Sequence, residues 1–343
     1  MKLRLVGITA VAAGLLVWRP AWPDGELRIY NWADYTSPEL IEKFESEHGV
    51  TVTLDTYDSS ETMLDTVRAG SAAYDVVVPA DHVVKVMIEE GLLAETKPNQ
   101  MDNFKHVDPR WIDVYWDPGR NYSVPWQLVL TAFTVDSAVY AGDINTLAIL
   151  FDPPDELKGR INMLEDMTPT MRAAEHYLGV PRCTGDPEHL KRIHELLTDA
   201  KPNWRSSDND TLKKLTSGEV AASQNWNGHS WRARQQRPTL AFAYPKEGTD
   251  ALMDNVSVLK HAPNLENARL FQNFVMAPEN AALISKFARY ANGITGSDRF
   301  LEPEFAHSPE IQPPAGAPEP EFAPPCAKKV VEQHDKIWTD LLK

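Results

Sequence analysis

The first part of the chain alternates regularly between segments typical of strands and segments typical of helices. Three segments are rich in β-branched and aromatic residues: LRIYNW (27–32), VTVTLDTY (50–57) and YDVVVPAD (74–81). Segments with apolar residues at helical spacing follow each of them, at 38–48, 60–70 and 82–93. Parallel strands need a crossover connection, which is usually a helix, so this alternation predicts an α/β fold with a mostly parallel sheet and flanking helices.

The first helical segment has clear signals at both ends. Ser37 is a suitable N-cap, Pro38 suits the first helical position, and Gly49 can end the helix. Leu40 and Phe44 fall on one face of the helix. We therefore expect this face to pack on the sheet.

The alternation continues through the rest of the chain. Further strands are expected in 122–136, 160–166, 240–248 and 255–260, and a helix followed by a strand in 210–226. Further helices are expected near 170–179, in 187–201, on both sides of Pro278 within 264–287, and in 327–342. With 343 residues, the chain is long enough for two domains.

The N-terminus has the layout of a secretory signal peptide. Lys2 and Arg4 precede an apolar run (5–18) that is too short to span a bilayer comfortably, and Arg19 and Pro20 end it. Residues 1–24 are therefore predicted to be a signal peptide that directs export of the protein. An uncleaved anchor is the alternative.

A signal peptide implies export to an oxidising compartment, where the two cysteines, Cys183 and Cys326, can form a disulfide bond. An even count permits one disulfide bond, which we predict, and two buried thiols are the alternative. Neither cysteine has metal-ligand spacing around it, so no zinc site is predicted.

The charge and the motifs exclude several function classes. A net charge of −15 disfavours nucleic-acid binding, which needs clusters of Lys and Arg, and is compatible with a cationic ligand. The nucleophile elbow, the P-loop, the dinucleotide fingerprint and the H-E-x-x-H motif are all missing from the sequence. A hydrolase would need a nucleophile–base pair, which is not evident, so we predict no enzyme, no cofactor and no metal.

Aromatic and acidic residues recur where the predicted strands end. In open α/β sheets, ligands bind beyond the carboxyl ends of the strands. Aromatic faces beside carboxylates are how proteins hold small organic cations. The candidate ligand-binding residues are Trp32, Asp34, Tyr35, Asp81, Trp126, Asp166, Trp226, His229, Asp254 and Tyr290.

These candidates also have structural alternatives. Trp32 and Trp126 can be core residues, because Trp is highly buried on average. Asp34, Asp81 and Asp166 can be helix-capping or helix-dipole residues. Packing between domains is the alternative for Tyr290, and a structural turn is the alternative for Trp226 and His229.

Taken in order, several segments resemble the periplasmic substrate-binding proteins of the putrescine/spermidine type, which are the soluble receptors of ABC importers. They are LRIYNWADYTSPELIEKFESEHGV (27–50), AGSAAYDVVVPAD (69–81), GEVAASQNWNG (218–228), YPKEG (244–248) with the following Asp254, and RYANG (289–293). The resemblance implies a two-lobe (type II-like) fold hinged by crossing strands, with the ligand enclosed between the lobes. It also implies a monomer in the periplasm that binds a small cationic or zwitterionic amine and an ABC permease.

The lobes implied by the resemblance are not continuous in sequence. Lobe 1 is expected at 25–131 with a return segment at 237–288, and lobe 2 at 132–236 with a C-terminal segment at 289–343. Both cysteines then fall in lobe 2.

The sequence departs from the family pattern at positions expected to meet the ligand. The family's Ser after the third strand is Ala80 or Asp81 here, and the acidic residue of the W-x-G-D form is His229. A further expected Glu falls near Thr168 and Pro169. A buried ammonium without a counter-charge is costly, so an opine or another amine with several polar groups is the alternative to a polyamine.

Overall fold

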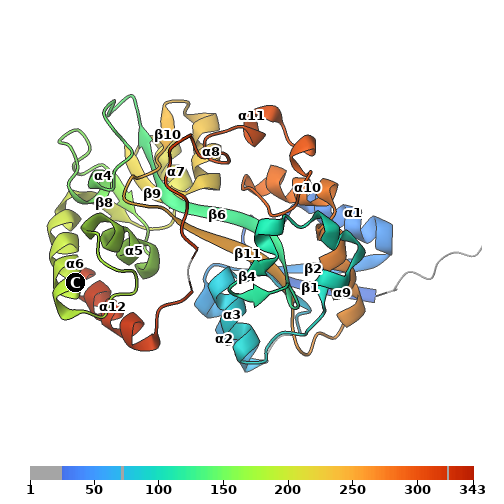
Figure 1. Ribbon diagram of the computed structural model, residues 1–343. Coiled ribbons are helices and arrows are strands. Elements are labelled where there is room, and N and C mark those ends of the chain that lie inside the picture. The colour runs from blue at the N-terminus through green and yellow to red at the C-terminus, as the bar shows by residue number, and fades with distance from the viewer. Residues whose placement is uncertain (1–24, 71–72, 323) are drawn as a thin grey trace, which may run out of the picture.

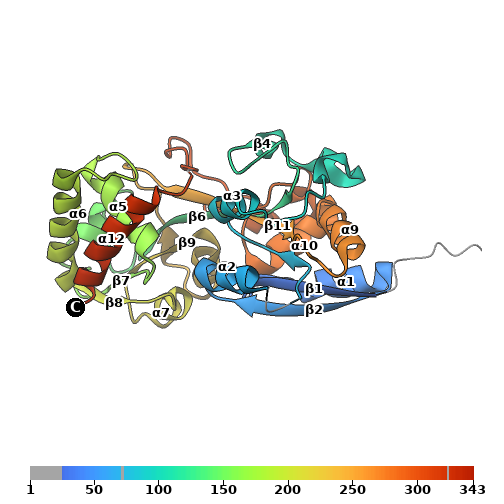
Figure 2. The same cartoon turned by 90° about the horizontal axis from the view of Figure 1, so that it is seen from below.

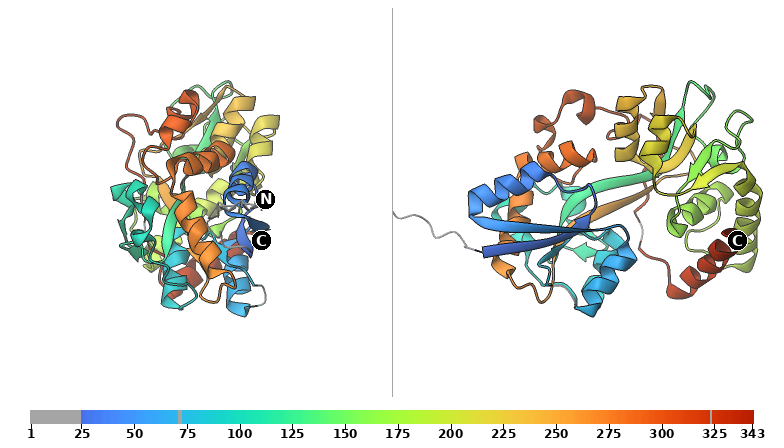
Figure 3. Two further views of the ribbon diagram at one scale, coloured as in Figure 1. Left: turned by 90° about the vertical axis from the view of Figure 1, so that its right-hand side faces the viewer. Right: turned by 180° about the vertical axis from the view of Figure 1, so that it is seen from behind.

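The structure is a computed structural model that describes residues 25–70, 73–322 and 324–343, so the predicted signal peptide lies outside the described residues. The chain forms two halves, each made of strands covered by helices, and two long strands run between them (Figure 1). The described chain begins in one half, called lobe 1 below, and ends in the other, called lobe 2 (Figure 3).

The strands are β1 Gly25–Trp32, β2 Val50–Tyr57, β3 Val76–Val77, β4 Asp113–Val114, β5 Asp117–Pro118, β6 Ser123–Asp136, β7 Ile161–Met163, β8 Trp204–Ser207, β9 Ala222–Trp226, β10 Leu240–Phe242 and β11 Asp250–Val258. The helices are α1 Pro38–His48, α2 Ser60–Ala69, α3 Asp81–Glu89, α4 Ala148–Phe151, α5 Met167–Leu178, α6 Pro187–Ala200, α7 Thr211–Ser217, α8 Asn227–Gln236, α9 Leu265–Val275, α10 Pro278–Ala288, α11 Pro303–Ala306 and α12 Lys328–Leu341.

One mixed sheet extends through both lobes. Its strand order is β2-β1-β3-β11-β6-β9-β7-β8, with β10 paired to β6. The pairs of β1 with β2 and β3, and of β7 with β8 and β9, are parallel. The two crossing strands, β6 and β11, pair antiparallel with each other. The predicted α/β class with crossing strands is confirmed, and the antiparallel pairs lie in the middle of the sheet.

The helix ends follow the expected local chemistry. The Ser37 hydroxyl accepts a hydrogen bond from the backbone of Leu40 at the start of α1, and Gly49 ends that helix in the left-handed conformation. Gly70 ends α2 in the same way. These caps fix where each helix turns back toward the sheet.

The alternating direction of side chains along β1 builds two cores in lobe 1. Ile29 packs in the cluster that contains Phe44 and Phe271, and the neighbouring Tyr30 packs in the cluster that contains Met87. Lobe 2 has its own core around Phe133. The helices α5, α6 and α12 pack together there, beside the ends of β7 and β8 (Figure 2).

Two local predictions were wrong. The apolar run at 74–81 has strand structure only at Val76–Val77, because Pro79 has no N–H to donate to a ladder and α3 already begins at Asp81. Residues 227–229, expected in a strand-end loop, begin α8 instead. The sequence of α8 (NGHSWRARQQ) is polar on most sides, so it lacks the apolar periodicity that predicts a helix.

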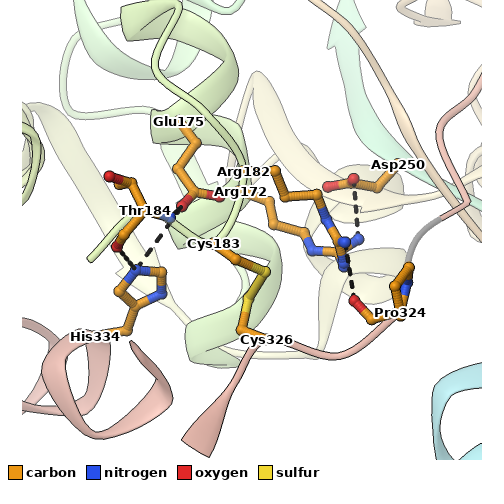
Figure 4. Close-up of a disulfide and its surroundings, with 9 residues drawn as sticks. All are labelled: Arg172, Glu175, Arg182, Cys183, Thr184, Asp250, Pro324, Cys326 and His334. Carbon is orange, nitrogen blue, oxygen red and sulfur yellow. Dashed lines mark hydrogen bonds and ion pairs between the residues drawn. A yellow bond between two sulfur atoms is a disulfide. The ribbon is translucent and has the colours of Figure 1, made fainter. Parts of the chain in front are cut away.

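The predicted disulfide is confirmed. Cys183 and Cys326 are bonded, with their Cα atoms 5.3 Å apart, and the bond ties the C-terminal segment to the loop between α5 and α6 (Figure 4). Among the described residues, no helix is both long enough and apolar enough to cross a membrane.

Candidate functional site

Trp32, Tyr35 and Asp254 lie together on the face of lobe 1 that meets lobe 2. The indole N–H of Trp32, at the end of β1, donates to the carbonyl of Val78 at 3.1 Å, and its ring lies 4.5 Å from that of Tyr57. The Tyr35 hydroxyl donates to Oδ2 of Asp254 at 2.7 Å. Aromatic rings thus surround one carboxylate.

The Asp254 carboxylate is buried and only half bonded. The residue is 4% exposed, and its Oδ1 has no hydrogen-bond partner within the described parts of the chain. Burial raises the pKa of Asp254 to about 7, and the charge of Asp81 adds to the rise, whereas the hydrogen bond from Tyr35 and a weaker contact from the Trp32 indole N–H oppose it. A bound cation is the partner that such an acid lacks, because it would favour the ionised form and occupy the free oxygen.

Asp81 places a second carboxylate near Asp254. It is 1% exposed at the start of α3, where Oδ1 accepts from the backbone of His82 at 2.8 Å and Oδ2 accepts from the Tyr115 hydroxyl at 3.0 Å. Asp81 lies at the N-terminus of a helix, which is the structural alternative given for it above. Its negative charge also raises the pKa of Asp254.

Arg120 is a fully buried cation on the same lobe. It donates from Nη1 to Oδ1 of Asn255 at 2.6 Å and to the Ser123 hydroxyl at 3.1 Å. Burial lowers the pKa of Arg120 to about 9, while the charges of Asp117 and Asp81 oppose this. The guanidinium therefore offsets part of the negative charge behind the site.

Trp226 and His229 form the opposing face, on lobe 2. The chain passes from β9 into α8 at Trp226, whose ring meets that of His229 edge-on with centroids 5.1 Å apart. Nδ1 of His229 lies 3.0 Å from the Thr211 hydroxyl. Burial lowers the pKa of His229 to about 4, with Arg232 lowering it further, so the imidazole is neutral near pH 7.

Tyr290 and Asp34 join the two faces. The Tyr290 ring is 5.6 Å from that of Tyr35, in an edge-to-face contact, and it also packs against the backbone of Gly228. A Cβ at Gly228 would lie 2.5 Å from this ring, so only glycine permits the approach. Asp34, exposed and with a positive φ of 52°, acts electrostatically on His229 across the junction.

Two predicted residues lie outside this group. Asp166 is exposed just before α5 and accepts a hydrogen bond from Nδ2 of Asn209 at 3.2 Å. Desolvation by the neighbouring protein raises the pKa of Asp166, and the charge of Glu61 of lobe 1 adds to the rise. Trp126 is 1% exposed inside the lobe 1 core, as its structural alternative anticipated, and its indole N–H has no partner among the residues described.

Sequence reasoning missed three residues near the site. Tyr57 ends β2, so the strand-end rule should have selected it. Arg232 lies three positions after His229 on α8, on the same face, but that helix was not predicted. Nothing in the sequence around Tyr115 indicated that its hydroxyl reaches Asp81.

The group that the structure brings together is therefore acidic, aromatic and largely buried at the junction of the lobes. It contains Trp32, Asp34, Tyr35, Asp81, Trp226, His229, Asp254 and Tyr290. Chemically, this arrangement suits an ammonium group, because carboxylate oxygens accept its protons and aromatic faces attract its charge.

The comparisons with known proteins agree with this chemistry. Residues 39–313 match the family model for bacterial extracellular solute-binding proteins. A spermidine/putrescine-binding periplasmic protein of Salmonella typhimurium is 32% identical over 294 residues, which cover 84% of this chain and 83% of the relative. Each of these descriptions names a binding protein, in agreement with the prediction that the chain is not an enzyme.

Solved structures share the fold. The spermidine/putrescine ABC transporter substrate-binding protein PotD of Streptococcus pneumoniae superposes with a TM-score of 0.83 at 21% identity, covering 93% of this chain and 99% of that one. The binding protein AgtB of A. tumefaciens R10, solved with agropinic acid, has a TM-score of 0.70 at 20% identity, covering 93% of this chain and 98% of its own.

Proposed function

The chain belongs to the bacterial extracellular solute-binding proteins, and on that premise we propose that it captures a small amine between its two lobes and delivers it to the permease of an ABC importer. The observation that carries the proposal is the buried Asp254 carboxylate, which has one unpartnered oxygen among the described residues and lies beside Tyr35 and Trp32. An ammonium group offers three donors and a full positive charge, which match that oxygen and the aromatic faces around it.

The first ligand class that we propose is a diamine or polyamine. The Salmonella relative at 32% identity is named as a binder of spermidine and putrescine. One ammonium of such a ligand would meet Asp254, and the carboxylates of Asp81 and Asp166 are the acceptors proposed for the others. Trp226 and Tyr290 would lie along the alkyl chain.

A specific observation also favours a zwitterionic amine. The charge of Arg232 reaches the site: it helps to lower the pKa of His229, and it opposes the rise that burial causes in the pKa of Tyr290. A guanidinium there would pair with a ligand carboxylate and disfavour a second ammonium. Pro169, in place of an acidic residue, removes a further acceptor for a polyamine. An amino acid with a distant amine, or an opine, is therefore the second candidate.

Capture would require the lobes to separate. Tyr35, Asp254 and Tyr290 are each less than 10% exposed, so a ligand cannot reach them in the described arrangement. We propose that bending of the crossing strands β6 and β11 opens the junction and that ligand contacts to both lobes favour closure. The lobe limits expected from the sequence, a monomeric state and a periplasmic location belong to the same proposal.

The test is the thermal unfolding of the mature chain with four probes: putrescine, spermidine, 4-aminobutyrate and agropinic acid. A ligand at about 100 times its Kd adds roughly 2.7 kcal/mol of stability. Putrescine and 4-aminobutyrate are a matched pair, because a carboxylate replaces one amine on a similar chain. Stabilisation by putrescine but not by 4-aminobutyrate supports the diamine.

Stabilisation by 4-aminobutyrate that is lost in Arg232→Gln supports the zwitterion. Agropinic acid has a lactam nitrogen and no ammonium group, so stabilisation by it alone would contradict an amine ligand. Asp113→Asn, at an exposed position of lobe 1, is the control and should leave every shift unchanged. The proposal fails if no amine moves the midpoint while a sugar or an inorganic anion does.

A further inference from the structure

A second polar cluster lies where α5, the start of β11 and the C-terminal segment meet. There the chain borders an open cavity of about 390 Å³, whose lining includes the cations Arg172 and Arg182 as well as His176 and Glu321. Asp250, the first residue of β11, lies beside them. These three residues come from three separate stretches of sequence, so their spacing gave no indication of a site.

The distances between these three side chains are those of groups that share an ion. Nε2 of His176 is 3.6 Å from Oδ1 of Asp250 and 3.7 Å from Oε2 of Glu321, and one donor atom from each residue lies within 4.8 Å of the others. Both separations are longer than a hydrogen bond of about 2.7–3.2 Å and lie within ion-pair range, so a protonated His176 between the two carboxylates is the alternative to a shared metal. Two ligand atoms on a tetrahedral metal, with bonds of about 2.0–2.2 Å, lie roughly 3.4 Å apart. This distance is close to the two measured separations.

The surroundings fix the orientation of two of these ligands. A Cβ on Gly248 would lie 2.6 Å from Nδ1 of His176, so the loop backbone covers that edge of the ring and Nε2 faces the carboxylates. Arg172 donates to Oδ1 of Asp250 at 3.0 Å (Figure 4). A carboxylate that binds a metal is usually held by such a second hydrogen bond.

Glu321 is held in place by its backbone. Its N–H donates to the carbonyl of Thr249 at 2.8 Å, and its carbonyl accepts from Ala251 at 3.0 Å. The disulfide at Cys326 anchors the same segment a few residues further on. The exposed side chain of Glu321 is therefore attached to a fixed main chain.

An independent observation also indicates a ligand at this place. Thr249 lines the cavity and is 2% exposed, yet its hydroxyl has no hydrogen-bond partner within the part of the chain that the structure describes. A buried hydroxyl without a partner is costly. A water molecule held by a metal in this cavity would supply that partner.

We propose that His176, Asp250 and Glu321 bind one divalent first-row transition-metal ion, such as Zn²⁺, with water from the cavity completing its coordination. One imidazole and two carboxylates suit such ions, whereas Ca²⁺ and Mg²⁺ prefer oxygen ligands alone. The ion joins α5 of lobe 2, the crossing strand β11 and the C-terminal segment, and thereby stabilises the base of the junction between the lobes. This site shares no residue with the amine group and does not depend on the proposed transport function.

The test is calorimetric titration of the untagged mature chain with Zn²⁺ after treatment with a chelator. The expected result is one ion per chain, with binding weakened at least about tenfold in His176→Gln and in Glu321→Gln. His194→Gln is the matched control, because His194 lies 3.0 Å from Asp340 in an exposed His–carboxylate pair and its loss should change nothing.

Co²⁺ provides a second measurement on the same protein. Its visible absorption should show tetrahedral coordination in the wild type and lose that signature in Glu321→Gln, whose exposed position leaves folding intact. Wild-type protein that binds no Zn²⁺, or His176→Gln that binds it as tightly as the wild type, overturns the proposal.

Discussion

Asp254→Asn should stabilise the ligand-free protein at pH 8 while weakening amine binding. The carboxyl is 4% exposed, and burial raises its pKa from the ordinary 3.8 to about 7. Between these two pH values the folded state holds a proton that the unfolded state has released, so stability falls as pH rises through this window. The difference between the pKa values of the unfolded and folded states corresponds to a loss of about 4 kcal/mol in the free energy of unfolding, as an upper bound. The amide of Asn carries no charge and avoids this loss.

The assay is urea unfolding of the ligand-free wild type and Asp254→Asn at intervals from pH 4 to pH 8. The variant should gain stability relative to the wild type across this range, by up to about 4 kcal/mol. The exposed Asp113→Asn serves as the control and should follow the wild type at every pH. Identical pH profiles for the wild type and Asp254→Asn would refute the reasoning, because they would mean that the carboxyl is not destabilised by burial.

Ligand binding should change in the opposite direction. Removing one member of a buried, hydrogen-bonded charge pair costs about 2–5 kcal/mol, which is roughly 30- to 5,000-fold in Kd. In the wild type, the affinity for an amine should also weaken below pH 7, because the ammonium needs the ionised form of Asp254. Calorimetry at pH 6 and pH 8 measures both effects.

Three further substitutions test other parts of the structure. Replacing Cys183 and Cys326 with Ser should cost about 2–5 kcal/mol in urea unfolding, because the bond closes a loop across 143 positions; an unchanged midpoint would speak against it. Gly228→Ala should lower the free energy of unfolding by about 1–3 kcal/mol, because the new Cβ would lie 2.5 Å from the Tyr290 ring. A variant with the stability and the amine affinity of the wild type would show that the ring is free to move. Tyr35→Phe removes the hydrogen bond that lowers the pKa of Asp254, so the pH midpoint of amine binding should move upward. A downward move would contradict the assigned hydrogen bond.

The parts of the fold that the sequence predicted are those governed by local chemistry. Ser37 and Gly49 bound α1 as expected, because capping depends on only a few neighbouring residues. The crossing strand β6 spans Ser123–Asp136, close to the predicted run, because its side chains are almost all buried and the sequence is mostly apolar. By contrast, α8 was missed because tertiary contacts, and not an apolar stripe, hold it in place.

The site was predictable only in part, and for a similar reason. Trp32 could be selected because it ends β1, and the topology of an α/β sheet gathers strand ends at one edge. Asp254 was selected because it precedes the predicted strand at 255–260, but it lies in the middle of β11, which begins at Asp250. The hydrogen bond from Tyr35 to Asp254 joins residues 219 positions apart, and only the folded chain brings them to 2.7 Å. For the same reason, no sequence pattern revealed that Arg232 acts on His229 or that Tyr115 reaches Asp81.

The most direct test of the central claim is a crystal structure of the mature chain grown with putrescine or 4-aminobutyrate, whichever stabilises it more. The account predicts the ammonium nitrogen within hydrogen-bond distance of Oδ1 of Asp254, with Trp32 and Tyr35 on one side and Trp226 and Tyr290 on the other. An amine bound elsewhere, with the Asp254 carboxylate still buried and unpaired, would contradict it.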